Sequence, residues 1–160
     1  MQYEVVFDIG RAGFRCWWFL APGLVLTVVG SALVYFRDQL PLRGPRFVRR
    51  AFPFAFLGFA AFWTVTAFGF TYVEYLRLTR ALTSGGASIV EGRVEAFDPM
   101  PYTGHKDESF VVAGKRFRYS DFEATSAFNN SRSHGGPIDE GVQVRVWYVG
   151  NRIVRLAVAR

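Results

Sequence analysis

The chain has 160 residues, enough for one compact domain or two very small ones. Apolar residues make up 51% and aromatic residues 18%, more than a soluble domain of this size buries with ease. The net charge of +6 leaves nucleic acid, anionic lipid and membrane topology as explanations, while the single cysteine, Cys16, excludes an internal disulfide and a cysteine metal cluster.

The first predicted element is a transmembrane helix at residues 16–36, which follows an N-terminal flank at residues 1–15. This run carries no charge, and at about 1.5 Å per residue it spans roughly 31 Å, the thickness of the hydrocarbon core of a bilayer. Trp17 and Trp18 stand near one end and Tyr35 near the other, as aromatic side chains do at the two membrane interfaces.

A second transmembrane helix is predicted at residues 51–75, followed at residues 76–86 by a helical stalk that a Gly-Gly pair ends. No charged residue occurs before Glu74, and small residues recur along the run, which lets helices in lipid approach closely. Residues 37–50 are predicted to form a turn between the two helices. The turn is rich in arginine: Arg37, Arg43, Arg46, Arg49 and Arg50.

The arginine-rich turn predicts the orientation of the chain. Short loops rich in Lys and Arg remain in the cytoplasm, so both ends of the helical hairpin are expected on the opposite side. In a bacterium the protein would be a multi-pass protein of the inner membrane, with its C-terminal domain in the periplasm. The same charges can contact anionic lipid headgroups. A nucleic-acid partner is not expected, because a tight turn with Pro41 and Pro45 offers little surface for stacking or groove contacts.

Residues 87–160 are predicted to form a small antiparallel β domain of about five strands. Apolar and charged residues alternate along much of this segment. Residues 109–120 and 142–160 are each expected to form a hairpin, with turns at Gly114 and Gly150. The expected fold class is a two-helix transmembrane hairpin followed by a small β-barrel or sandwich, of SH3-like or OB-like type.

Two loops interrupt the predicted β domain, at residues 98–108 and 121–141. The second is long for so small a unit, and long loops often carry function. These loops are therefore the predicted partner-binding surface. The candidate residues are His105, Glu108, Phe122, Phe128 and His134.

An alternative interpretation gives the loops a chemical role. His105, Glu108 and His134 would form a three-ligand zinc-like site if the two loops meet. The sequence contains no HExxH pair, so neither a metal nor another cofactor is expected. Ser133 next to His134 lacks the Gly-x-Ser-x-Gly elbow of a serine hydrolase, and enzymatic activity is not expected.

The stretches "VEGRVEAF", "SFVVAGKRFRYSDF" and "GVQVRVWYVGNRIVRLAV" carry a resemblance to a group of bacterial membrane proteins. In that group two transmembrane helices precede a small β domain catalogued as domain of unknown function 3592. The likeness covers residues 65–160 in organisation and brings no catalytic residues. The chain has a more distant likeness to NfeD-type proteins, which tether a small β-barrel to membrane helices.

The function expected from these patterns is that of a membrane-anchored interaction or scaffolding module, such as an accessory subunit of a larger membrane complex. Its expected partners are the lipid bilayer and another membrane protein or further copies of the chain, because two helices alone bury little of their aromatic surface. The alternative is a membrane-tethered enzyme or metal-binding domain that uses the loops around His105 and His134.

Overall fold

The computed structural model describes residues 2–39 and 45–160, and the chain divides into two compact units. The helical unit comprises Cys16–Tyr72, and the β unit comprises Met1–Arg15 together with Val73–Arg160. The β unit therefore includes the N-terminal flank, which the sequence analysis had kept apart from the predicted domain at residues 87–160.

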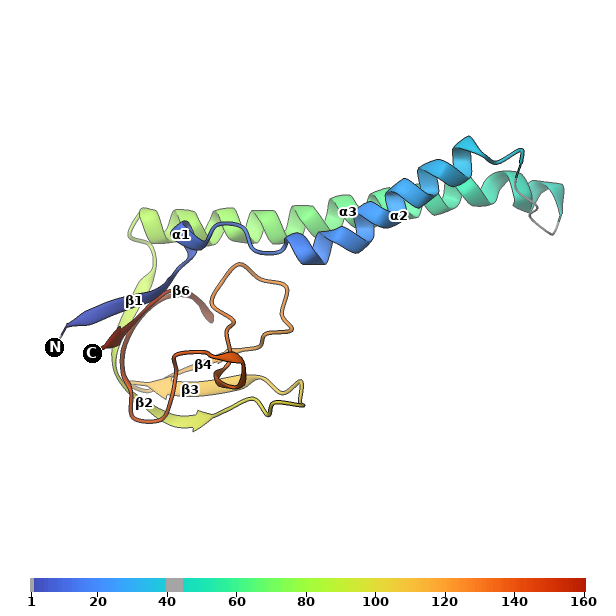
Figure 1. Ribbon diagram of the computed structural model, residues 1–160. Coiled ribbons are helices and arrows are strands. Elements are labelled where there is room, and N and C mark those ends of the chain that lie inside the picture. The colour runs from blue at the N-terminus through green and yellow to red at the C-terminus, as the bar shows by residue number, and fades with distance from the viewer. Residues whose placement is uncertain (1, 40–44) are drawn as a thin grey trace. The chain divides into compact units, whose positions relative to one another are not determined.

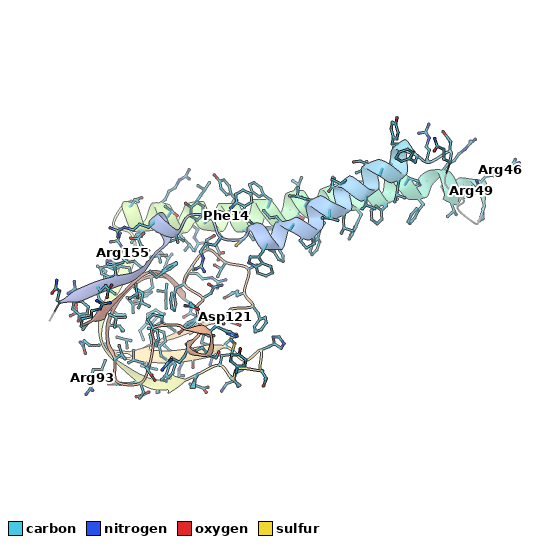
Figure 2. All side chains as sticks on the ribbon, in the orientation of Figure 1. Phe14, Arg46, Arg49, Arg93, Asp121 and Arg155 are labelled. Carbon is cyan, nitrogen blue, oxygen red and sulfur yellow. The ribbon has the colours of Figure 1, made fainter. Side chains whose placement is uncertain are left out.

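Two long helices form the helical unit. α2 (Trp17–Tyr35) and the first part of α3 (Arg46–Thr83) run antiparallel to each other, and side chains project outward from both (Figures 1 and 2). By length and composition, both helices can cross a membrane. α2 matches the helix predicted at residues 16–36 to within a residue at each end.

The second helix begins earlier than predicted, and the predicted helical stalk is its continuation. α3 begins at Arg46, inside the segment predicted as a turn, and it continues without interruption to Thr83. The predicted transmembrane helix and the predicted stalk are thus one helix, whose residues from Val73 onward belong to the β unit. Arg43, one of the five predicted topology residues, lies outside the described residues.

The two helices pack closely where α2 carries glycine. A Cβ atom at Gly30 would lie 2.9 Å from the Cα of Leu57, and one at Gly23 would lie 2.6 Å from the Thr64 hydroxyl oxygen. The hydroxyl groups of Thr27 and Thr64 lie 3.3 Å apart and form a hydrogen bond between the helices. Residues without bulky side chains thus let the two backbones approach each other.

The β unit is built on one antiparallel sheet with the strand order β1-β6-β5-β2-β3-β4. The two predicted hairpins are confirmed as β3–β4 and β5–β6. A short helix, α1 (Ile9–Ala12), follows the first strand, and a 3-10 turn, η1 (Arg132–His134), lies in the long loop. The strands are β1 (Tyr3–Asp8), β2 (Ser88–Asp98), β3 (Glu108–Val112), β4 (Lys115–Tyr119), β5 (Gln143–Val149) and β6 (Arg152–Ala159).

The prediction of about five strands in residues 87–160 is confirmed by β2 to β6, but the predicted closure into a barrel is wrong, because the sheet in the described residues has a sixth strand and is not closed. The additional strand is β1, from the N-terminal flank, and it pairs with β6. By doing so β1 takes up the edge of β6 that closure of a five-stranded barrel would have needed. The two ends of the chain consequently lie side by side, and the backbone N–H of Arg160 donates to the carbonyl of Gln2 at 3.0 Å (Figure 1).

β2 joins the two halves of the sheet. Its first half pairs with β5 and its second half with β3, and the register with β3 shifts between Glu95 and Asp98. Ala96 in this bulge has a φ of 49°, which L-amino acids other than Asn and Asp seldom adopt. The backbone N–H of Phe97 donates to the carboxylate of Glu140 at 2.7 Å, which satisfies a group that the bulge removes from the ladder.

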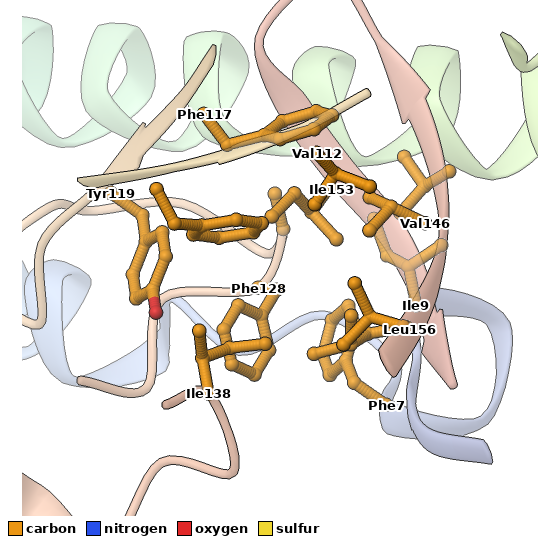
Figure 3. Packing of buried hydrophobic residues seen from close by; sticks show 14 of the residues in the cluster. Phe7, Ile9, Val112, Phe117, Tyr119, Phe128, Ile138, Val146, Ile153 and Leu156 are labelled. Carbon is orange, nitrogen blue, oxygen red and sulfur yellow. The ribbon is translucent and has the colours of Figure 1, made fainter. Parts of the chain in front are cut away.

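A continuous apolar core fills the β unit (Figure 3). Every strand of the sheet contributes to it, together with α1, Leu78 of α3 and the loop at residues 121–141. Phe110 and Phe117 face each other across the β3–β4 hairpin with their ring centroids 5.3 Å apart. This core explains how the short strands stay together, because each side chain of this size that is buried contributes about 1.5–3 kcal/mol.

Candidate functional site

A pocket of about 790 Å³ opens among the loops of the β unit. We call it the loop pocket. Its walls come from the C-terminal turns of α3, from the end of β4 and the residues after it, from the loop before β3, and from the β5–β6 turn. The lining residues are Glu74, Arg77, Leu78, His105, Asp107, Arg118, Tyr119, Ser120, Phe122, Glu123, Val149, Gly150, Asn151 and Arg152.

Arg152 holds one wall of the loop pocket in place. Its guanidinium lies 3.0 Å from a carboxylate oxygen of Glu74 on α3 and 2.5 Å from one of Glu123 in the long loop. Burial alone would lower the pKa of Arg152, but the hydrogen bond to Glu123 and both negative charges outweigh it and raise the pKa. The Thr125 hydroxyl also donates to Glu74 at 3.1 Å. One network of charged side chains thus joins α3, the loop at residues 121–141 and the β5–β6 turn.

Two predicted partner-binding residues meet in the loop pocket. The rings of His105 and Phe122 lie edge to face with their centroids 4.1 Å apart, and Phe122 is 53% exposed. His105 comes from the loop before β3 and Phe122 from the long loop, so the two predicted loops do come together. An exposed aromatic ring beside charged side chains is a common feature of protein-binding surfaces.

Glu108 and Phe128 were predicted to be exposed loop residues that contact a partner, but both are buried in the structure. Glu108 is the first residue of β3 and is fully buried. It accepts hydrogen bonds from the Tyr119 hydroxyl and from the backbone N–H groups of Met100 and Arg132, at 3.3 Å and 2.9 Å for the two backbone donors. It is a structural carboxylate that joins β3 to both loops.

Phe128 packs in the core rather than in an exposed loop. Its ring centroid lies 5.5 Å from that of Phe7 and 5.1 Å from that of Tyr119. Burial and the hydrogen bond to Glu108 raise the pKa of Tyr119, so its hydroxyl stays protonated and remains a donor.

His134 belongs to a second cluster, centred on Asp121 (labelled in Figure 2). The Asp121 carboxylate accepts hydrogen bonds from the Ser131 backbone N–H at 2.6 Å and the Ser131 hydroxyl at 2.5 Å, and it contacts Nδ1 of His134. The hydroxyl of Ser133 lies 3.4 Å from that same nitrogen. In a Ser-His-Asp triad the carboxylate and the serine use different ring nitrogens, so this cluster has a different arrangement.

The three candidate zinc ligands are not brought together. His105 packs on Phe122, Glu108 is saturated by hydrogen bonds in the core, and His134 is held by Asp121. Within residues 2–39 and 45–160, no group of three or more His, Cys, Asp or Glu side chains is placed to hold a metal ion. The metal-binding alternative therefore receives no support from the geometry of these side chains.

Several residues of the loop pocket were missed by sequence reasoning. Arg77, Arg118, Glu123 and Arg152 come from a helix, a strand end, a loop and a second hairpin, and no local motif connects them. The signal that the sequence offered for β1 is the run of aromatic and β-branched residues in Tyr3–Asp8, which is typical of a strand.

Comparisons of the chain with protein-family models, with curated proteins and with solved structures give no match. The resemblance to two-helix membrane proteins with a small β domain stays a prediction.

Proposed function

We propose that the chain is a membrane-anchored interaction module, in which the helical unit spans a bilayer and the β unit offers the loop pocket to a protein partner. The observation that carries the membrane anchor is the exposure of large apolar side chains along both helices. Val28 is 70% exposed, Phe62 is 68% exposed and Phe70 is 78% exposed. A helix that is apolar all round requires an apolar surrounding, and the short partner helix covers only one side.

The proposed orientation follows from charge. The arginines after the end of α2 and at the start of α3 favour a cytoplasmic turn, which in a bacterial inner membrane would leave the β unit in the periplasm. Gln39 and Glu95 are exposed positions in the turn and the β unit. A cysteine at each, in a Cys16→Ser background, tests the orientation with a membrane-impermeant label. We expect Glu95→Cys to react in intact spheroplasts and Gln39→Cys only after lysis; the reverse pattern would contradict the proposal.

The partner is proposed to be another membrane protein or a further copy of the chain, with the protein acting as an accessory subunit of a larger complex. The support is the loop pocket itself, which combines exposed Phe122 with a fixed network around Arg152. Such a site, an aromatic anchor framed by charged groups, suits a protein surface.

Site-specific photo-crosslinking tests the partner surface. A photoreactive residue at Phe122 is expected to give a discrete crosslinked product in whole membranes, and the same residue at exposed Glu95 on β2 is not. Arg118→Glu, which reverses a charge in the pocket wall, should abolish the product at Phe122. A product of equal yield at both positions, or one insensitive to Arg118→Glu, would remove the loop pocket from the proposal.

A further inference from the structure

The helical unit has a second pocket near the end of α2 and the start of α3, and most of the described residues that line it are arginines. It has a volume of about 240 Å³, and the described residues around it are Arg37, Asp38, Arg46, Arg49 and Arg50. We call it the arginine pocket. Figure 2 shows Arg46 and Arg49 projecting at the start of α3.

The charges of the arginine pocket are poorly balanced within the helical unit. Among the described residues, four guanidinium groups and one carboxylate, that of Asp38, line it. Asp38 lies 3.6 Å from Arg37, and its side chain is 89% exposed, so this ion pair contributes little. The pocket therefore carries an excess of positive charge that an anion would neutralise.

The start of α3 adds to this excess. Arg46, Arg49 and Arg50 lie in the first turns of the helix, and the first turn contains no acidic residue. The free backbone N–H groups of a helix N-terminus form the positive end of its dipole, where cationic side chains are unfavourable and anions are stabilised. Guanidinium groups beside such N–H groups form a set of donors suited to phosphate oxygens.

An apolar pocket adjoins the arginine pocket. It has a volume of about 450 Å³ and is lined by Arg46, Phe47, Arg50 and Ala51, so Arg46 and Arg50 border both pockets. These two arginines are one helical turn apart, and Phe47 between them is 81% exposed. A ligand that fills both pockets must join an anionic group to an apolar chain.

From these two adjoining pockets we infer that the start of α3 binds an anionic phospholipid, with its phosphate in the arginine pocket and the beginning of an acyl chain against Phe47. The inference rests on the proposed function only in assigning the helical unit to a bilayer. It goes further by giving the arginines a specific ligand, in addition to any effect of their charge on orientation.

Native mass spectrometry of the full chain in a neutral detergent tests this inference, with added dioleoyl-phosphatidylglycerol as the probe and dioleoyl-phosphatidylcholine as the uncharged counterpart. We expect one phosphatidylglycerol to bind before any others and phosphatidylcholine to give no such first site. The variant Arg46→Gln/Arg50→Gln should reduce occupancy of the first site about tenfold or more. Arg80→Gln, which removes a single charge in the last turn of α3, should leave it unaltered.

Two further arms identify the chemistry. Arg46→Lys/Arg50→Lys keeps the charge but not the planar fork of donors, and we expect occupancy between those of the wild type and the glutamine variant. Inorganic phosphate at millimolar concentration should not displace the lipid, because it leaves the pocket beside Phe47 empty. Displacement by phosphate, equal binding of the two lipids, or an effect of Arg80→Gln as large as that of the double variant would overturn the inference.

Different results would contradict the lipid site and the membrane anchor. Resistance of the wild type and of Arg46→Gln/Arg50→Gln to alkaline carbonate extraction from membranes reports on the membrane anchor alone. A chain that stays in the membrane but has no preferred site for phosphatidylglycerol contradicts only the lipid site. A chain released by carbonate contradicts the anchor.

Discussion

Glu108 and Tyr119 stand opposite each other in the β3–β4 hairpin, and the Tyr119 hydroxyl donates a hydrogen bond to the Glu108 carboxylate inside the β unit. Because the same carboxylate accepts from the backbone N–H groups of Met100 and Arg132, it holds both loops against the sheet. A buried carboxylate with this many donors is costly to replace, because its partners lose their acceptor without regaining water.

Glu108→Ala is therefore expected to lower the free energy of unfolding by about 3 kcal/mol or more, and Tyr119→Phe by about 1–2 kcal/mol. The measurement is denaturant unfolding of the full chain in detergent, followed by tryptophan fluorescence. Glu95→Ala, at an exposed position of β2, should change stability by less than about 0.5 kcal/mol. Equal effects of Glu108→Ala and Glu95→Ala would show that the carboxylate is not structural.

The case of Glu108 illustrates what a sequence can say about a site. The sequence located two loops and predicted that they carry the candidate partner-binding residues. Two of these, His105 and Phe122, do meet there. Whether a loop carboxylate points to solvent or into the core depends on donors far along the chain, here Tyr119 and Arg132. Such long-range partners leave no periodic signal, so the buried role of Glu108 was not predictable.

Asp8 gives the β unit a pH-dependent contribution to stability. Burial alone would raise the pKa of Asp8, but hydrogen bonds from Arg155 and from the backbone N–H groups of Gly10 and Arg11 outweigh it and lower the pKa. The unfolded chain has a pKa of about 3.9 for this group. The stabilisation is therefore complete above about pH 5 and is lost as the pH falls through the lower pKa of the folded state.

We expect the difference in free energy of unfolding between the wild type and Asp8→Asn to shrink as the pH falls from about 5 to about 2. Urea unfolding at a series of pH values measures it. Asp139→Asn is the matched control, because Arg132 lowers the pKa of Asp139 too, but at a solvent-exposed position where the pair is screened. A difference for Asp8→Asn that does not vary with pH would contradict this account.

The fold was predictable where a pattern is local. Two uncharged runs predicted two helices, and alternation around glycine turns predicted the β3–β4 and β5–β6 hairpins. The missing element was β1, because Tyr3–Asp8 was interpreted as a flank of the first helix rather than as a strand. Its partner β6 lies at the other end of the chain, and pairing across that separation is set by the core around Phe7. Without β1 the predicted sheet had a free edge, which favoured closure into a barrel.

Gly30 should be sensitive to any larger side chain, because a Cβ there would lie 2.9 Å from the backbone of Leu57. Gly30→Ala is expected to force α2 and α3 apart and to destabilise the helical unit by about 1–3 kcal/mol. Thermal unfolding in detergent and the distance between spin labels on the two helices measure the effect. Gly58→Ala is the control, since no described atom lies within 4 Å of a Cβ at that position of α3. Equal behaviour of the two variants would contradict the close contact.

At two other positions we expect the opposite effect. Replacing an alanine of positive φ by glycine should stabilise the β unit. Ala96 lies in the β2 bulge with a φ of 49°, and Ala113 lies in the β3–β4 turn with a φ of 47°. A Cβ atom disfavours this region by about 1–2 kcal/mol, whereas glycine enters it freely at the cost of a more flexible unfolded chain. We expect Ala96→Gly and Ala113→Gly each to raise the free energy of unfolding by up to about 1 kcal/mol.

The control for these two changes is Ala87→Gly, at a position just before β2 that does not have a positive φ. There glycine adds freedom to the unfolded chain and removes a methyl group that packs against the core, so stability should fall by about 0.5–1 kcal/mol or more. Ala113 is the sharper test of the two positions, because Gly114 after it also has a positive φ and the pair forms the two-residue turn that favours Asn-Gly and Gly-Gly sequences. If Ala113→Gly lowered the free energy of unfolding as Ala87→Gly does, Ala113 would not be strained in the hairpin turn, and this prediction would be wrong.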